Sequence, residues 1–116
     1  MKHFLVILSL TASRQEVGPR LLAQHDRHFH AGQDLALFLC HGRCTPGDGY
    51  LALARSRSLE TLYAFIQEDP LVAEGLATVE VLEFEPAEFP EVLRGWMHPM
   101  GFGAGQDLAA GFGIAI

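Results

Sequence analysis

The segment from Glu68 to Phe84 constrains the fold of this chain more than any other stretch. Pro70 disfavours helical geometry at the residue before it, so a helix that reaches this segment must end at Asp69. A short turn then runs to Gly75, and the residues 79–84 predict a strand. The chain therefore turns sharply from a helix into its last strand.

Two helices and three strands are predicted before this segment. Gly18-Pro19 opens the first helix, because proline suits a first turn, and an apolar stripe follows that includes His25 and Phe29. Ser58 is the natural N-cap of the second helix. Continuously apolar runs predict strands at residues 3–10, 35–40 and 50–54. The order βαββαβ predicts an α+β, ferredoxin-like sandwich with one antiparallel four-stranded sheet.

The apolar strands also predict burial on both faces of the sheet. Two helices can cover one face only, which leaves the C-terminal tail and a second subunit as candidates for the other face. We favour the second subunit and expect a homodimer through the sheet face opposite the helices, because large exposed apolar patches are uncommon on soluble monomers.

The 116 residues predict one folded domain at 1–85 and a partly flexible, glycine-rich C-terminal extension at 86–116. Gly101–Gly105 is not a dinucleotide loop, because Gln106 replaces its third glycine and no strand–turn–helix pattern surrounds it. The extension has apolar residues that we expect to act as anchors, namely Phe102, Leu108, Phe112 and Ile114. Residues 97–116 are expected to add little to the core, so that a chain ending near Arg94 keeps its fold.

Charge and hydropathy exclude several functions. The net charge of −6 argues against general nucleic-acid binding, which needs a basic surface. Residues 1–57 nevertheless carry a net charge of +3 and residues 58–116 one of −9, so a small anionic ligand fits the first half. No segment approaches the roughly 20 apolar residues of a membrane span. The run Phe4–Leu10 is at the lower limit for a signal peptide, and a strand is needed there, so we expect a cytoplasmic protein, with a cleaved signal as the alternative.

Cys40 and Cys44 are the only cysteines. On an extended strand their Cα atoms would lie ~13 Å apart, which is too far for a disulfide. A zinc site with the neighbouring histidines is the alternative, but the spacing lacks a Cys-x-x-Cys pair. We therefore expect free thiols, no metal and no cofactor.

Several motifs recur here in the order of a known family. They are His25, the strand end Leu37–Gly42, the turn at Pro46 and Gly49, and Asp69-Pro70 through Gly75-Leu76-Ala77. Over about residues 3–85 the chain thus resembles the YciI-like (YCII-related) family of the dimeric α+β barrel superfamily. The resemblance implies a dimeric ferredoxin-like domain whose histidine–aspartate centre corresponds to His25 and Asp69. The chain departs from the family at His41-Gly42-Arg43, where the family usually has Ser-Gly-Pro, and this bears on the substrate.

Some relatives of this kind isomerise or dehydrohalogenate ring compounds without a metal. The resemblance therefore implies a cofactor-independent enzyme that transfers protons on a small cyclic or anionic substrate. A non-catalytic small-molecule binding module and a dimeric interaction domain are the alternatives.

Each candidate residue also has a purely structural interpretation. His25 on an apolar stripe can be a core histidine, and Asp69 before proline can be a helix cap, a role compatible with orienting His25. His28, His41 and Arg43 are the candidate substrate-binding residues. His28 lies one turn beyond His25 and can instead sit at the solvent edge, and Arg43 can clamp a carboxylate or remain solvated at the strand end.

Overall fold

The computed structural model describes residues 1–45 and 47–98, and it confirms the α+β, ferredoxin-like fold. One antiparallel sheet has the order β2-β3-β1-β4. Its strands are β1 (Lys2–Leu10), β2 (Phe38–Arg43), β3 (Tyr50–Ser56) and β4 (Ala77–Phe84). The helices are α1 (Arg14–Val17), α2 (Pro19–Asp34), α3 (Leu59–Gln67), α4 (Pro70–Ala73), the 3-10 turn η1 (Glu91–Leu93) and α5 (Arg94–Met97).

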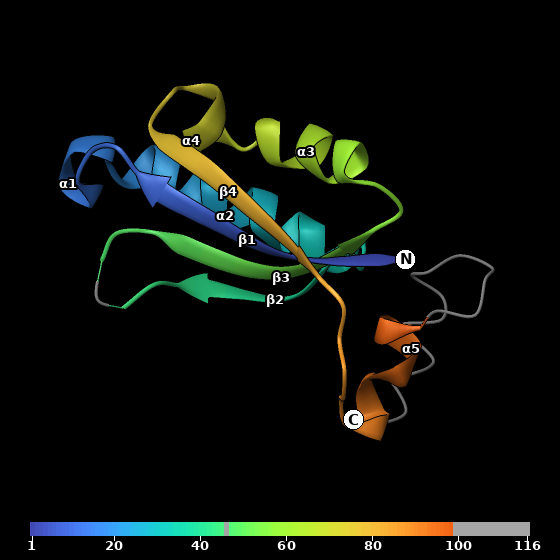
Figure 1. Ribbon diagram of the computed structural model, residues 1–116. Helices are drawn as coiled ribbons and strands as arrows, with labels where there is room; N and C mark the ends of the chain where they lie inside the picture. The colour runs from blue at the N-terminus through green and yellow to red at the C-terminus, as the bar shows by residue number, and fades with distance from the viewer. Residues whose placement is uncertain (46, 99–116) are drawn as a thin grey trace.

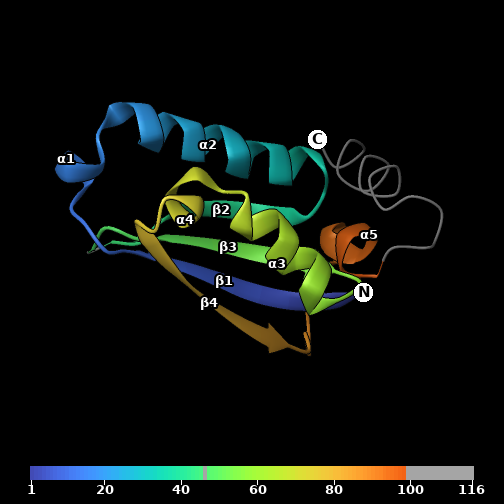
Figure 2. The same cartoon turned by 90° about the horizontal axis from the view of Figure 1, so that it is seen from above.

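The helices α2, α3 and α4 lie on one face of the sheet (Figures 1 and 2). Between them and the sheet is a core that includes Phe4 and Val6 of β1, Phe29 of α2 and Leu62 of α3, all nearly or fully buried. Gly32 lets α2 approach the sheet closely, since a β-carbon there would lie 2.7 Å from the Phe38 ring. The helices thus bury the inner side chains of the strands.

The local sequence signals place the helix boundaries. Ser58 caps α3 by accepting a hydrogen bond from the Thr61 amide, and Pro19 occupies the first turn of α2. The second strand begins at Phe38, not at the predicted Leu35. Ala36 has a positive φ of 61°, which breaks the extended backbone, and Leu35 ends α2.

Among the described residues, the face of the sheet opposite the helices carries exposed apolar side chains. Leu5 of β1 lies between Leu53 and Leu82 in the register of the neighbouring strands, and Leu53 is only partly buried. Leu82 is 49% exposed and Phe84 is 38% exposed. The predicted cover of this face by a second subunit stays a prediction.

The segment after β4 returns to one end of the sheet. Trp96 is fully buried, and its indole Nε1 donates a hydrogen bond of 3.1 Å to the carbonyl oxygen of Ala36. The Arg55 guanidinium packs on the indole and donates to the carbonyl oxygen of Trp96 at 2.7 Å. A chain that ends near Arg94 would lose this contact, and whether it would keep its fold stays a prediction.

The remaining expectations for the C-terminus concern the glycine-rich stretch and the anchors Phe102, Leu108, Phe112 and Ile114, all of which lie outside the described residues. In the part of the chain that is described, no helix combines the length and the apolar character needed to cross a membrane.

Candidate functional site

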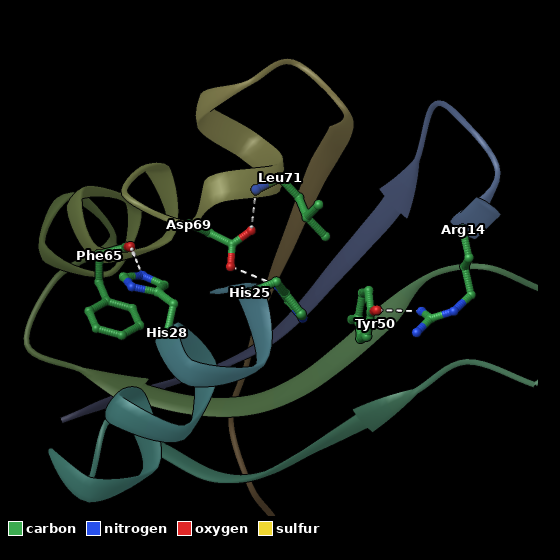
Figure 3. A network of polar contacts seen from close by, with 7 residues as sticks. All are labelled: Arg14, His25, His28, Tyr50, Phe65, Asp69 and Leu71. Carbon is green, nitrogen blue, oxygen red and sulfur yellow. Dashed lines mark hydrogen bonds and ion pairs between the residues drawn. The ribbon is translucent and has the colours of Figure 1, made fainter. Parts of the chain in front are cut away.

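His25 and Asp69 form a buried pair between α2 and the start of α4 (Figure 3). The helical stripe of α2 directs His25 toward the sheet. Asp69 has extended backbone geometry, because Pro70 follows it and α4 begins there. His25 Nδ1 lies 2.7 Å from Asp69 Oδ1, and Asp69 Oδ2 accepts a hydrogen bond of 3.0 Å from the Leu71 amide. One oxygen of the Asp69 carboxylate thus orients the His25 imidazole, and the other caps α4.

Burial makes the pairing necessary. His25 is 1% exposed and Asp69 is fully buried, and a buried carboxylate without hydrogen-bond donors would be costly. An ionised carboxylate can only accept hydrogen bonds, so Nδ1 of His25 carries the hydrogen in this contact. The neutral imidazole then has its lone pair on Nε2, which is the arrangement that a general base requires.

The two ring nitrogens of His25 differ in their contacts. Nδ1 is bound to Asp69, whereas Nε2 has no hydrogen-bond partner among the described residues. Nε2 is therefore the ring nitrogen that remains for a ligand.

Aromatic rings form the walls around His25. The Tyr50 ring lies 4.0 Å from the imidazole, measured between ring centroids, and the Phe29 ring lies at 4.4 Å. The Tyr50 hydroxyl accepts a hydrogen bond from Arg14. Sequence reasoning missed Tyr50 and Arg14, although a phenol at the start of an otherwise aliphatic strand was a usable signal.

His28 is placed apart from the pair. Its Nε2 lies 2.7 Å from the carbonyl oxygen of Phe65, and its ring stacks on the Phe65 ring at 4.2 Å. These contacts join α2 to α3 and give His28 a structural role. Its predicted part in substrate binding stays a prediction.

His41 and Arg43 are exposed on the edge strand β2. The His41 ring lies 5.7 Å from the Phe29 ring, which in turn contacts His25. Loss of hydration lowers the pKa of His41, the nearby His25 lowers it further, and the charge of Asp26 opposes both. His41 therefore favours its neutral form near His25.

Two shallow surface depressions meet at His41. The larger, of about 580 Å³, lies between α2 and β2 and is lined by Asp26, Arg27, His30, Ala31, Asp34 and His41. The smaller, of about 210 Å³, is lined by Cys40, His41, Gly42, Arg43, Cys44 and Leu51. These depressions place His41 and Arg43 where a ligand from solvent can reach them.

The cysteines Cys40 and Cys44 are free thiols. Across residues 1–45 and 47–98, no group of three or more His, Cys, Asp or Glu side chains is arranged to hold a metal ion. The groups that the structure does bring together are those of acid–base chemistry.

Comparisons with known proteins show the fold. No protein-family model matches the chain, and no curated protein matches it either. Among solved structures, the chain is similar to 5-chloro-2-hydroxyhydroquinone dehydrochlorinase from Burkholderia phenoliruptrix AC1100, in complex with 2,5-dihydroxybenzoquinone. The TM-score is 0.57 at 16% sequence identity, over 72% of this chain and 93% of that enzyme. The two proteins therefore share a fold.

Proposed function

We propose that this chain is a YciI-like, cofactor-independent enzyme in which His25 and Asp69 transfer protons on a small cyclic or anionic substrate. The observation that carries the proposal is the buried 2.7 Å contact between the imidazole and the carboxylate. A histidine with an oriented tautomer and one nitrogen left without a partner has the groups that a general base needs.

The reaction follows from these roles. Nε2 of His25 accepts a proton from a carbon of the substrate, and Asp69 stabilises the imidazolium that forms. In an isomerisation the imidazolium returns the proton to another atom of the substrate. In a dehydrohalogenation the electron pair of the broken C–H bond forms a C=C bond, halide leaves with the electrons of the C–X bond, and the imidazolium releases its proton to water. The shared fold with a dehydrochlorinase supports the second reaction class.

The substrate would approach from β2. His41 and Arg43 are exposed there and are our candidates for binding it, with His28 as a more distant candidate. Arg43 carries the charge and the planar donors that recognise a carboxylate or a phenolate oxygen.

The competing function is non-catalytic binding of a small molecule in the same place. The 1% exposure of His25 favours it over catalysis, because a nearly enclosed imidazole has little access to a reacting atom of a substrate. A dimeric interaction domain is the third candidate. It is supported by the open apolar face around Leu53, Leu82 and Phe84, through which we propose that the chain forms a homodimer. The free thiols fit a reducing compartment, and we propose the cytoplasm.

The test is a nitrogen-15 NMR titration of the histidine side chains, with 2,5-dihydroxybenzoquinone as probe ligand. The proposal predicts a His25 imidazole that holds its hydrogen on Nδ1, titrates reversibly in the folded protein and changes its resonances when the probe is added. His25→Gln should remain folded and lose probe binding, whereas the matched variant His98→Gln, at an exposed position just after α5, should keep it. A His25 ring that neither titrates nor responds to the probe would favour packing alone.

A further inference from the structure

We infer that Arg14 and Tyr50 form an oxyanion site beside His25, which binds an ionised oxygen of a planar substrate such as a phenolate, an enolate or a carboxylate. The inference rests on the proposed function and assigns a recognition role to two residues that the histidine–aspartate pair does not involve.

Asp69, His25, Tyr50 and Arg14 lie in this order across the site (Figure 3). Asp69 binds His25, the His25 ring contacts the Tyr50 ring, and the Tyr50 hydroxyl accepts a hydrogen bond from Arg14 Nη1. The Arg14 guanidinium carbon also lies 5.5 Å from the centroid of the Tyr50 ring. The Tyr50 side chain therefore lies between the His25 imidazole and the Arg14 guanidinium.

Among the described residues, Arg14 has no acidic partner to neutralise it. Its contacts in residues 1–45 and 47–98 are with Tyr50, and no carboxylate there forms an ion pair with it. The nearest carboxylate in sequence, Glu16, accepts a hydrogen bond of 3.1 Å from the Ser13 amide in the cap of α1. The Tyr50 contacts position the guanidinium, which keeps further N–H donors for a ligand.

Tyr50 is suited to donate to the same ligand. It is 4% exposed, and because its oxygen accepts from Arg14, its own hydrogen remains available for an acceptor. Arg43 lies opposite Tyr50 in the β2–β3 register, so its side chain starts from the same face of the sheet and adds positive charge. Asp48 and Asp26, the carboxylates of the adjoining loop and helix face, are exposed to solvent.

An oxyanion site is what the proposed chemistry needs at this place. When His25 removes a proton from a carbon next to a carbonyl group, negative charge develops on the carbonyl oxygen. A hydroxyl and a guanidinium already oriented in a largely buried site stabilise such charge without reorganising. The substrate class is therefore a planar ring or enone with an oxygen that is ionised before or during proton transfer.

The test compares benzoate with benzamide, which has nearly the same shape and no charge. Binding to the full chain is followed by NMR, and we expect benzoate to bind at least about tenfold more tightly, the gain of one charge-assisted hydrogen bond. Arg14→Gln should abolish this preference, Tyr50→Phe should reduce it, and Arg14→Lys should retain part of it. Arg57→Gln, at an exposed position after β3, is the matched control and should behave as the wild type.

Equal affinity for the two probes in the wild type, or an unchanged preference in folded Arg14→Gln, would overturn the inference. His25→Gln separates it from the proposed function, because the anion is held by Arg14 and Tyr50 and the preference should survive. A preference that depends on Arg14 together with a His25 that does not titrate would refute the acid–base proposal and leave the anion site standing.

Discussion

Replacing Asp69 by alanine or by asparagine should separate its two roles. Alanine removes both contacts. The buried charge-assisted hydrogen bond to His25 contributes about 1.5–3 kcal/mol and the cap of α4 about 1 kcal/mol. We therefore expect Asp69→Ala to lower the free energy of unfolding by about 3 kcal/mol. Asparagine keeps an acceptor for the Leu71 amide and should cost about 1 kcal/mol.

Asparagine should nevertheless inactivate the site. Its oxygen can cap Leu71, and its amide group then donates toward His25, so Nδ1 must become the acceptor. The hydrogen moves to Nε2, so the proposed base loses its lone pair on that nitrogen. Loss of a general base costs about 100- to 10,000-fold in rate. A well-folded Asp69→Asn protein with the wrong tautomer is thus the expected result.

Two measurements decide this prediction. Urea unfolding gives the two stability losses, and nitrogen-15 NMR of the imidazole reports which nitrogen carries the hydrogen. Equal losses below about 1 kcal/mol for both variants would show that the pair is not buried and bonded in solution. An unchanged tautomer in Asp69→Asn would show that Asp69 does not orient His25.

Three further predictions follow from the sheet and its ends. Leu82→Glu on the open face should give a monomer in sedimentation experiments, whereas Leu59→Glu on α3 should not, and a wild-type monomer at micromolar concentration would refute the dimer. Trp96→Ala should lower the free energy of unfolding in urea by about 3–5 kcal/mol, and a chain that ends at Arg94 should lose at least as much. A small loss in both would show that the segment after β4 is dispensable. Burial, and then the positive N-terminus, lower the pKa of His3 in the folded chain. The unfolded chain therefore takes up a proton on His3 more readily than the folded chain, so the free energy of unfolding falls as pH drops below about 6.5. Between pH 7 and pH 5, His3→Gln should lose less of this free energy than the wild type.

Much of the architecture was readable because single residues mark its boundaries. Pro19, Ser58 and Pro70 each act through local backbone chemistry, so they placed α2, α3 and α4 without knowledge of tertiary contacts. The start of β2 was misplaced because a positive φ at Ala36 has no signature in an alanine. Where a strand begins within an apolar run depends on the strands that pair with it, which the local sequence does not show.

The candidate site was also predictable only in part from the sequence. His25 and Asp69 were identified from the helical stripe, the Asp-Pro junction and the family resemblance, and the structure brings them into contact. Arg14 and Tyr50 are 36 residues apart, and only the tertiary structure brings the Arg14 side chain of α1 to Tyr50 of β3. Trp96 was missed because it lies in a segment whose composition suggests a loose tail. Contacts of this kind depend on tertiary structure, which local patterns do not encode.

The double use of Asp69 limits how this protein can evolve. The carboxylate that orients His25 also begins α4, and the Leu76 amide bonds back to the carbonyl oxygen of Leu71 as the chain enters β4. A substitution that altered the acid–base pair would therefore also disturb the entry into an edge strand. Under the proposed function, new substrates are more readily accommodated by changes at His41 and Arg43, whose side chains are exposed on the edge strand β2. These are also the positions at which the sequence differs from the YciI-like pattern that it resembles.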